Sequence, residues 1–369
     1  MSDDIKLIAF HLPQFHECEE NNMWWGKGFT EWNNTRQAKP IFYGHNQPRE
    51  PLNDYYYDLS CKRDILWQMK MAKDYHIYGF CFYHYWFDGK LLLEKPAELL
   101  LQNADINIRY CFSWANEPWA RTWDGKAHHV LMPQCYGDKE SWKNHFDYLL
   151  PFFKDTRYIK EDNCPMFLIY KSQSIEQLPE MMSCWNQWAK EAGFNGIHFV
   201  ETLRSAEVDK RDLPFKAMVE FEPVRCNMQQ SFISLNYKRL RRRFIHLLNC
   251  IFQRSIALNR PFSFEEVAKR SVRCHSPKGT YAGAFVGWDN TPRRQLAGTI
   301  ILPPSKEQFK QYLKNKIEQT RNVYHTNYVF INAWNEWAEG TVLEPSQSDN
   351  YKYLEAISEL MNEYSDAFR

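Results

Sequence analysis

Short apolar runs recur along the whole chain and predict eight β-strands. The runs are continuous, with few polar residues between the apolar ones. Such continuity is typical of parallel strands whose two faces are both buried. The predicted strands span residues 6–12, 78–83, 108–112, 166–170, 196–201, 217–222, 281–286 and 328–331.

Between most of these strands the apolar positions fall at helical spacing, at 61–75, 96–102, 142–153, 181–192, 307–321 and 351–364. This alternation predicts an α/β fold, and eight strands favour one (β/α)8 TIM-type barrel over residues 1–369. A doubly wound open sheet is the rival architecture. That fold would carry a glycine-rich phosphate-binding turn after the first strand, where this chain has His11-Leu12-Pro13-Gln14.

Two long segments interrupt the alternation. Residues 13–60 show no clear periodicity, and long ordered loops in compact domains are usually functional. Residues 226–278 form a predicted helical insertion, in which a basic helix at about 237–254 carries an apolar stripe. The simplest interpretation is a helix packed on the barrel with a solvated basic face. Contact with a membrane surface or an acidic glycan is the alternative. The stripe consists of Tyr237, Leu240, Phe244, Leu247, Leu248 and Ile251.

The overall charge is nearly balanced, with 46 Lys and Arg against 45 Asp and Glu, so nucleic acid is not a predicted partner. Aromatic residues reach 16%, which favours a carbohydrate-binding surface. The ten cysteines are scattered singly, without the spacing of zinc ligands, and we predict no metal or cofactor. No secretory signal is visible, which predicts a cytoplasmic protein, or a periplasmic one if a leader has been removed.

The last predicted strand runs into the segment NAWNEWAEG, where the candidate chemistry is concentrated. Glu336 and Glu339 are three positions apart, so one helical turn or a tight loop aims both carboxylates at the same space. Trp334 and Asn335 precede them. Two carboxylates beside flat aromatic faces are the composition of a sugar-cleaving site, in which one acid protonates a leaving oxygen and one base activates a nucleophile.

Five blocks together carry a family resemblance: IAFHLPQFHE, WWGKGFTEWNN, GFCFYHYWFDGK, SWANEPWARTWDG and NAWNEWAEGTVLEP. They resemble the WbsX family of polysaccharide-biosynthesis glycosyltransferases. That family is similar to glycoside hydrolase family 99, the endo-α-mannosidases and endo-α-mannanases. The resemblance implies a (β/α)8 barrel and a retaining reaction. Glu336 would deprotonate the sugar 2-hydroxyl, and Glu339 would be the acid/base. The residue between them, often His in the hydrolases, is Ala338 here, which weakens the transfer of substrate preference.

Asn116-Glu117 offers a second catalytic scheme. An Asn-Glu pair at a strand end is the acid/base pattern of many retaining barrel glycosidases, with Glu336 then acting as the nucleophile of a double displacement. In the preferred scheme Glu117 instead binds a substrate hydroxyl. Relatives of the WbsX type often carry Asn-Glu-Asn-Trp here, and this chain has Pro118.

Polar and aromatic residues that follow strand ends or lie in the first long loop are candidates for sugar contacts, because a barrel's active site lies at the C-terminal ends of its strands. The candidate substrate-binding residues are His11, Gln14, Trp24, Trp32, Tyr83, His84, Tyr85, Trp114, Asn116, Arg121, Trp123, Asp124, Trp288, Asp289, Trp334 and Asn335.

Three functions compete. The first is a glycosidase acting on a polysaccharide or oligosaccharide. The second is a glycosyltransferase of surface-polysaccharide assembly, and the third is a carbohydrate-binding barrel without catalysis. The carboxylate pair favours the glycosidase, while the fold alone does not fix the function. The sequence leaves the sugar, its linkage and the oligomeric state open.

Overall fold

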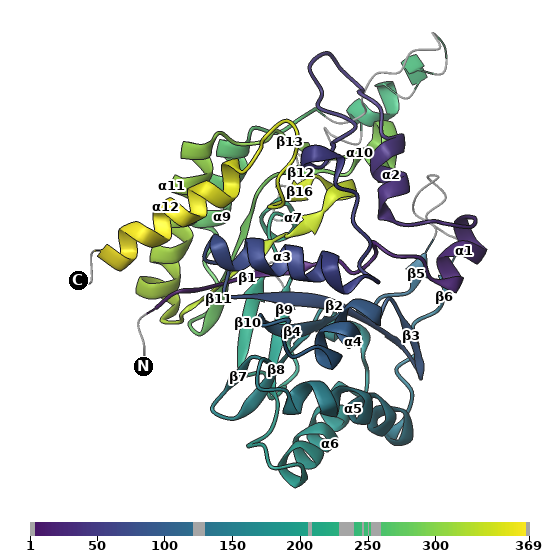
Figure 1. Cartoon of the computed structure of the whole chain (residues 1–369), viewed down its shortest axis with the longest axis vertical. Coiled ribbons are helices and arrows are strands. Elements are labelled where there is room, and N and C mark those ends of the chain that lie inside the picture. Colours follow the sequence, from purple (N-terminus) through teal and green to yellow (C-terminus); the bar gives the residue numbers. More distant parts are fainter. Residues whose placement is uncertain are drawn as a thin grey trace.

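The computed structural model describes residues 4–120, 130–205, 209–228, 240–245, 247–249, 251 and 260–366. Its centre is a closed ring of eight parallel strands (Figure 1). β1 pairs with both β2 and β14, which closes the ring and confirms the predicted (β/α)8 barrel. The ring strands are β1 (Lys6–His11), β2 (Gly79–Phe87), β4 (Arg109–Trp114), β8 (Cys164–Ile169), β9 (His198–Leu203), β10 (Ala217–Glu220), β11 (Thr280–Phe285) and β14 (Tyr328–Asn332).

Helices cover the outside of the ring, with α5 and α6 below the strands and α9, α11 and α12 at the upper left in Figure 1. None of the described helices is both long and apolar enough to cross a membrane. The outer helices are α3 (Lys62–Asp74), α4 (Lys95–Gln102), α5 (Lys139–Lys154), α6 (Leu178–Glu191), α9 (Phe264–Arg273), α11 (Lys306–Gln319) and α12 (Lys352–Asp366).

Side-chain caps explain why two of these helices begin where they do. The Asp138 carboxylate accepts hydrogen bonds from the backbone N–H groups of Glu140 and Ser141, at 3.0 and 3.2 Å, so α5 begins before the first apolar residue of its stripe. Ser305 and Gln308 form a capping box at the start of α11. The apolar pattern alone placed the start of α5 at residue 142.

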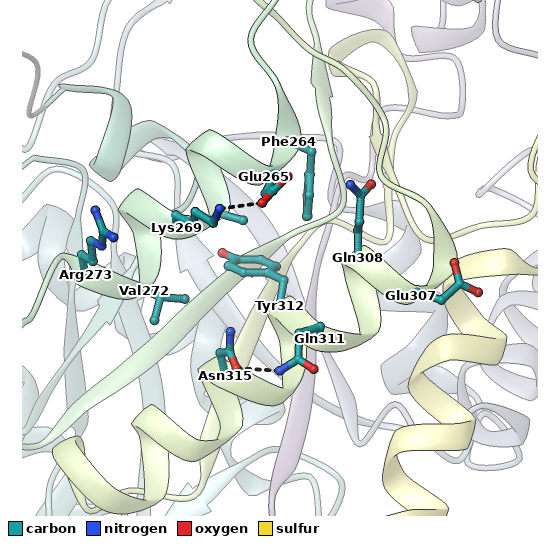
Figure 2. Close-up of a pocket in the computed structure, with 11 residues that line it drawn as sticks. Phe264, Glu265, Lys269, Val272, Arg273, Glu307, Gln308, Gln311, Tyr312 and Asn315 are labelled. Atoms are coloured by element: carbon teal, nitrogen blue, oxygen red, sulfur yellow. Dashed lines mark hydrogen bonds and ion pairs between the residues drawn. The ribbon is translucent and has the colours of Figure 1, made fainter.

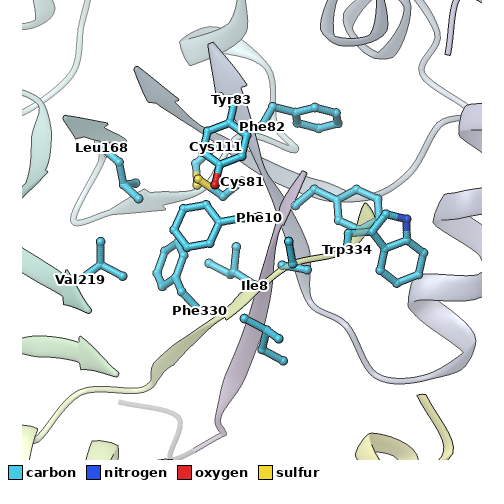
Figure 3. Packing of buried hydrophobic residues seen from close by; sticks show 14 of the residues in the cluster. Ile8, Phe10, Cys81, Phe82, Tyr83, Cys111, Leu168, Val219, Phe330 and Trp334 are labelled. Atoms are coloured by element: carbon cyan, nitrogen blue, oxygen red, sulfur yellow. The ribbon is translucent and has the colours of Figure 1, made fainter. Parts of the chain in front are cut away.

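Aromatic side chains fill the barrel interior. The rings of Tyr83 and Phe330 lie 5.8 and 5.6 Å from the ring of Phe10, measured between centroids (Figure 3). Cys81 and Cys111 are buried in the same cluster, where they act as small core residues. Because side chains alternate between the two faces of a strand, every second residue points outward to the helices instead.

The two long segments contain helices that the periodicity did not reveal. α1 (Glu19–Trp25) and α2 (Glu31–Gln37) lie in the first segment, between β1 and α3. The second segment begins with α7 (Val224–Met228) and includes α9. The ring of Phe264 on α9 packs edge-on against Tyr312 of α11, with the centroids 5.5 Å apart. The end of the predicted insertion is therefore one of the outer helices of the barrel.

Short antiparallel strand pairs lie in the connections between the ring strands and the outer helices. β3 (Lys90–Leu92) extends β2, and β7 (Lys160–Glu161) pairs with β8. The remaining pairs are β5 (Trp119–Ala120) with β6 (Val130–Met132), β12 (Trp288–Asp289) with β13 (Ile300–Ile301), and β15 (Asn335–Glu336) with β16 (Thr341–Val342).

Candidate active site

Three glutamates surround the guanidinium group of Arg293 at the C-terminal end of the barrel. Arg293 Nη1 donates to Glu339 Oε1 at 2.6 Å, and Nη2 lies 3.5 Å from Glu336 Oε2. Its Nε donates to Glu31 Oε1 at 3.1 Å, and Nη2 contacts the same oxygen. Arg293 belongs to α10 (Thr291–Arg294) after β11, Glu31 to α2 after β1, and the other two glutamates follow β14. Three loops from neighbouring strands therefore build one cluster.

A tight turn presents Glu336 and Glu339 on the same side. Glu336 lies on β15, and a single 3₁₀ turn over Trp337–Glu339 leads to Gly340 in the left-handed region, with φ of 62°. A Cβ at Gly340 would lie 2.7 Å from the Cβ of Asp289. Glycine is needed here because only a residue without a side chain fits both the backbone conformation and the close approach.

Burial shifts the pKa of two glutamates of this cluster, Glu336 and Glu31. Glu336 has an exposed fraction of only 6%, and its pKa is raised well above the usual value by burial and by the charge of Glu339, although Arg293 opposes the shift. Burial also raises the pKa of Glu31, and Arg293 again acts in the opposite direction. A carboxyl group with a raised pKa is a stronger base once it is ionised, which suits abstraction of a proton from a sugar hydroxyl.

Glu117 lies in a separate ion-pair group. Its Oε1 accepts from Arg204 Nη1 at 3.0 Å and from Lys171 Nζ at 3.3 Å. The Arg204 guanidinium lies 4.4 Å from the centroid of the Tyr170 ring. Asn116 fixes the backbone of Lys171 through hydrogen bonds of 2.8 and 2.9 Å. Asn116 therefore positions the partner of Glu117, and its own side chain is fully buried.

Aromatic side chains extend away from the carboxylates. Tyr83 and Tyr85 lie on β2, and for both of them burial and the charge of Glu336 raise the pKa well above the usual value. The ring of Tyr85 lies 5.0 Å from Trp119, whose ring is in turn 6.1 Å from Trp24. Trp24 and Trp119 are both partly exposed. This row of rings offers flat apolar faces beside the acidic cluster.

The sequence profile of one family, described as Glycosyltransferase WbsX, matches residues 7–357. The chain belongs to the WbsX family. Two curated relatives, each named uncharacterized protein WxcX and found in two strains of Xanthomonas campestris pv. campestris, are 35% and 34% identical over 366 and 362 residues. The alignments cover 98% of this chain and 50% of each relative, so the WbsX-family chain spans about half the length of these relatives.

Solved structures share the barrel of this WbsX-family chain. Two structures of a glycoside hydrolase family 99 endo-α-mannosidase from Bacteroides thetaiotaomicron have TM-scores of 0.57, with 15% and 16% identity. They cover 100% of this chain and 98% and 99% of theirs. A glycoside hydrolase-like protein also has a TM-score of 0.57, at 13% identity, with coverage of 97% and 94%. These likenesses show a glycoside hydrolase-like fold.

Three predicted sugar contacts of the WbsX-family chain point away from the barrel mouth, so those predictions are wrong. His11 Nε2 lies 2.9 Å from Gln68 Oε1 on α3, and His84 Nε2 lies 2.8 Å from His145 Nε2 on α5. The ring of Trp114 also packs against His145. All three residues do lie at the ends of strands, which is why the sequence selected them. Because side chains alternate between the two faces of a strand, these three point outward to the helices.

Several further predicted contacts are buried. Asn335 bonds both backbone groups of Leu12, at 2.8 and 3.0 Å, and Asp289 accepts from His45 and Gln47 at 2.8 and 2.6 Å. Both side chains therefore hold loops together, and we correct their predicted roles from sugar binding to positioning. Other buried candidates are Gln14, Trp32, Trp288 and Trp334.

Arg121, Trp123 and Asp124 lie outside the described residues, so their predicted contacts stay predictions. Within the described ranges, no group of three or more His, Cys, Asp or Glu side chains is arranged to hold a metal ion. Sequence reasoning did not select Glu31, Lys171, Arg204 or Arg293 for the site. Two features of the sequence could have indicated them. Glu31 is next to the predicted contact Trp32, and the other three residues follow predicted strands.

A groove elsewhere on the molecule contains none of the predicted site residues. It has a volume of about 520 Å³ and lies between α9 and α11 (Figure 2). Phe264 and Tyr312 form its floor, and Lys269 donates to Glu265 at 2.5 Å along one border. Since it lies between two outer helices, it is separate from the carboxylate cluster.

Proposed function

We propose that the chain is a glycosidase that cleaves a polysaccharide or oligosaccharide with retention of configuration. The observation that carries the proposal is the convergence of Glu336 and Glu339 on one guanidinium group at the C-terminal end of the barrel. A glycosidase needs two carboxyl groups beside one bond. The fold that the chain shares with family 99 hydrolases supports the same reaction.

In this mechanism Glu336 takes the proton of the sugar 2-hydroxyl. The hydroxyl oxygen then attacks the anomeric carbon, and the bond to the leaving oxygen breaks as Glu339 donates a proton to it. In the second step water attacks the anomeric carbon of the resulting 1,2-anhydro sugar and gives a proton to Glu339. The bond from the anomeric carbon to the 2-oxygen breaks, and Glu336 returns its proton to that oxygen. Burial supports the assignment of Glu336, because the ionised carboxylate there is a strong base.

Arg293 would hold the two carboxylates at the right separation and balance their charge. Glu31 fixes the guanidinium group from behind, at Nε and Nη2. A clamped guanidinium needs little reorganisation during the reaction, which is the advantage of a preorganised site. Glu31 and Arg293 are therefore assigned as positioning residues.

The scheme in which Glu117 is the acid/base has less support. The same Glu117 oxygen contacts Arg204 and Lys171, and no contact joins Glu117 to the Arg293 cluster among the described residues. We assign Glu117 and its cations to binding substrate hydroxyls at the rim. Tyr85, Trp119 and Trp24 would stack on sugar rings next to the cleaved bond.

The test is incubation of the purified protein with α-linked mannans, rhamnans and O-antigen polysaccharides, followed by mass spectrometry of the products. Glu339→Gln is the matched control because it removes one ionisable oxygen and keeps the shape. Oligosaccharides released by the wild type but not by the variant are the expected result. Equal release by both proteins would contradict the proposal.

A glycosyltransferase is the second candidate, favoured by the match to the family described as Glycosyltransferase WbsX. The same barrel and carboxylates would then transfer a sugar to a hydroxyl acceptor instead of water. Chain extension after addition of nucleotide sugars, without release of oligosaccharides from any glycan, would favour this candidate over the glycosidase.

A further inference from the structure

A helix in the connection between β10 and β11 presents an apolar stripe to solvent. The helical residues described there are 240–245, 247–249 and 251. Leu240, Phe244, Leu247 and Ile251 have exposed fractions of 73, 61, 55 and 61%. Their spacing of four, three and four residues places them on one side of an α-helix. We call these four residues the exposed stripe.

The opposite side of this helix attaches it to the protein. Ile245 is buried, with an exposed fraction of 8%, and it lies away from the exposed stripe on the helical wheel. The sequence predicted that the stripe packs on the barrel. That prediction is wrong for the described members of the exposed stripe. These four side chains face solvent, and the helix packs on the protein through Ile245 instead. Tyr237, at the start of the predicted stripe, lies outside the described residues.

Basic residues accompany the exposed stripe. Arg242 and Arg243 are exposed on the same helix. Residues 226–264 contain seven Lys and Arg and no Asp or Glu. The net charge of the whole chain is +1, so the remainder of the chain carries 1 − 7 = −6. This segment is therefore a positive island on an otherwise acidic protein, and its complement is an anionic surface.

We propose that this helix docks the protein on an anionic membrane surface. Apolar side chains on one side of a helix and basic residues around them form the pattern that inserts into the boundary between lipid headgroups and acyl chains. A hydrated acidic glycan would pair with the arginines but would leave the exposed stripe in water. A second copy of the helix would bring like charges together beside the apolar seam.

Docking would set the orientation of the catalytic end. The helix lies at the same end of the long axis of the molecule as α2 and α10, which carry Glu31 and Arg293 (Figure 1). Membrane contact through the exposed stripe would therefore bring the mouth of the barrel toward the headgroups. The proposal concerns binding alone and does not depend on the reaction.

The test is sedimentation of the full chain with vesicles of phosphatidylcholine alone or of phosphatidylcholine with phosphatidylglycerol. We expect binding only to the vesicles with phosphatidylglycerol, weakened by added salt. Arg243→Gln changes the exposed arginine that flanks the exposed stripe on the helical wheel. It should weaken binding by about fivefold, the contribution of one arginine near an anionic surface. Lys73→Gln on α3, also exposed, is the matched control and should change little.

A second pair of variants separates the apolar contribution from the charge. Phe244→Ser with Leu247→Ser should reduce binding by about tenfold or more for each residue. Leu302→Ser with Val323→Ser removes exposed apolar side chains elsewhere and should leave binding unchanged. Circular dichroism checks that each variant stays folded. No binding by the wild type, or equal binding by all variants, would overturn the proposal. A dimer in sedimentation velocity that depends on Leu247, without vesicle binding, would also overturn it.

Discussion

Two buried glutamates after strands of the same barrel behave in opposite ways. Glu220, at the end of β10, is fully buried, and Glu336 is nearly so. The Glu220 carboxylate accepts from Lys316 Nζ at 2.7 Å, Tyr324 OH at 2.6 Å and Arg225 Nη1 at 3.2 Å. Lys316 and Arg225 hold the pKa of Glu220 below its usual value although burial acts in the opposite direction.

Glu336 has much weaker support from its surroundings. Within the described part of the chain its carboxylate has one polar partner, Arg293 Nη2, at 3.5 Å. Its pKa is raised well above the usual value by burial and Glu339. The comparison teaches that burial alone does not decide the role of a glutamate. A carboxylate with two close cations belongs to the framework, whereas one with few donors keeps oxygens available for chemistry.

Glu344 is an intermediate case, which shows that neutral hydrogen-bond donors and cations affect a buried carboxylate differently. It accepts hydrogen bonds from Tyr57 OH, Gln68 Nε2 and Trp337 Nε1 at 2.8, 2.7 and 2.7 Å. Burial nevertheless raises the pKa of Glu344 to about 7. Three neutral donors therefore do not hold a buried carboxylate fully ionised at neutral pH, and the cations beside Glu220 make the difference.

The largest expected effect is on activity at Glu336. Glu336→Gln should reduce the rate of oligosaccharide release by about 10²–10⁴-fold, because the proposed base is lost. Its free energy of unfolding should stay within about 1 kcal/mol of wild type, since few contacts are removed. Initial rates and urea unfolding measure the two quantities. A large loss of stability together with unchanged activity would show instead that Glu336 stabilises the fold and takes no part in the reaction.

Glu220→Gln should give the opposite pattern. It leaves the buried cations of Lys316 and Arg225 without their carboxylate, and the expected destabilisation is about 3–5 kcal/mol. Under conditions where the variant is folded, its rate of oligosaccharide release should remain near wild type. Urea unfolding followed by tryptophan fluorescence measures the loss. Wild-type stability in the Glu220→Gln variant would show that the ion pairs of Glu220 do not stabilise the fold.

Glu344→Gln tests the intermediate case through pH. In the wild type the folded state holds a proton on Glu344 between pH 4.5 and about 7, where the unfolded state has lost it. Glu344 therefore lowers the free energy of unfolding as pH rises through this window, by about 3 kcal/mol in total. The stability difference between wild type and variant should change by that amount between pH 4.5 and 8. A constant difference would contradict the raised pKa.

The smallest expected effect is at the turn that presents Glu336. Gly340→Ala places a side chain at positive φ and against Asp289, so a destabilisation of about 1–2 kcal/mol is expected, with reduced activity. Gly193→Ala is the matched control, because Gly193 also has positive φ but has open space around its Cβ position. Both variants should lose stability in thermal melting, and only Gly340→Ala should lose activity.

The sequence was enough to predict the barrel, because all eight ring strands are apolar runs with little ambiguity. It also placed Glu336 and Glu339 in one turn, as the structure shows. It did not predict which side chains after a strand face the mouth. His84 and Tyr85 are adjacent, and a shift of one residue exchanges the helix-facing and the interior side.

Long-range partners explain the remaining gaps. Arg293 and Glu31 are separated by 262 positions, and nothing in either local pattern specifies that they meet. The prediction that the exposed stripe packs on the barrel failed for another reason. Helical spacing shows that apolar residues share a side of a helix, but the pattern is the same whether that side meets the barrel or the solvent.

The pairing of β1 with β14 has a consequence for synthesis of the chain. Lys6 lies opposite Tyr328 in this pair, so the contact closes a loop of 322 positions. Glu31 leaves the ribosome long before Glu336 does, and the clamp around Arg293 has to wait for the last ring strand. In the proposed mechanism a nascent chain is therefore inactive until its final ring strand emerges, and chaperones would meet a barrel with open edges until then.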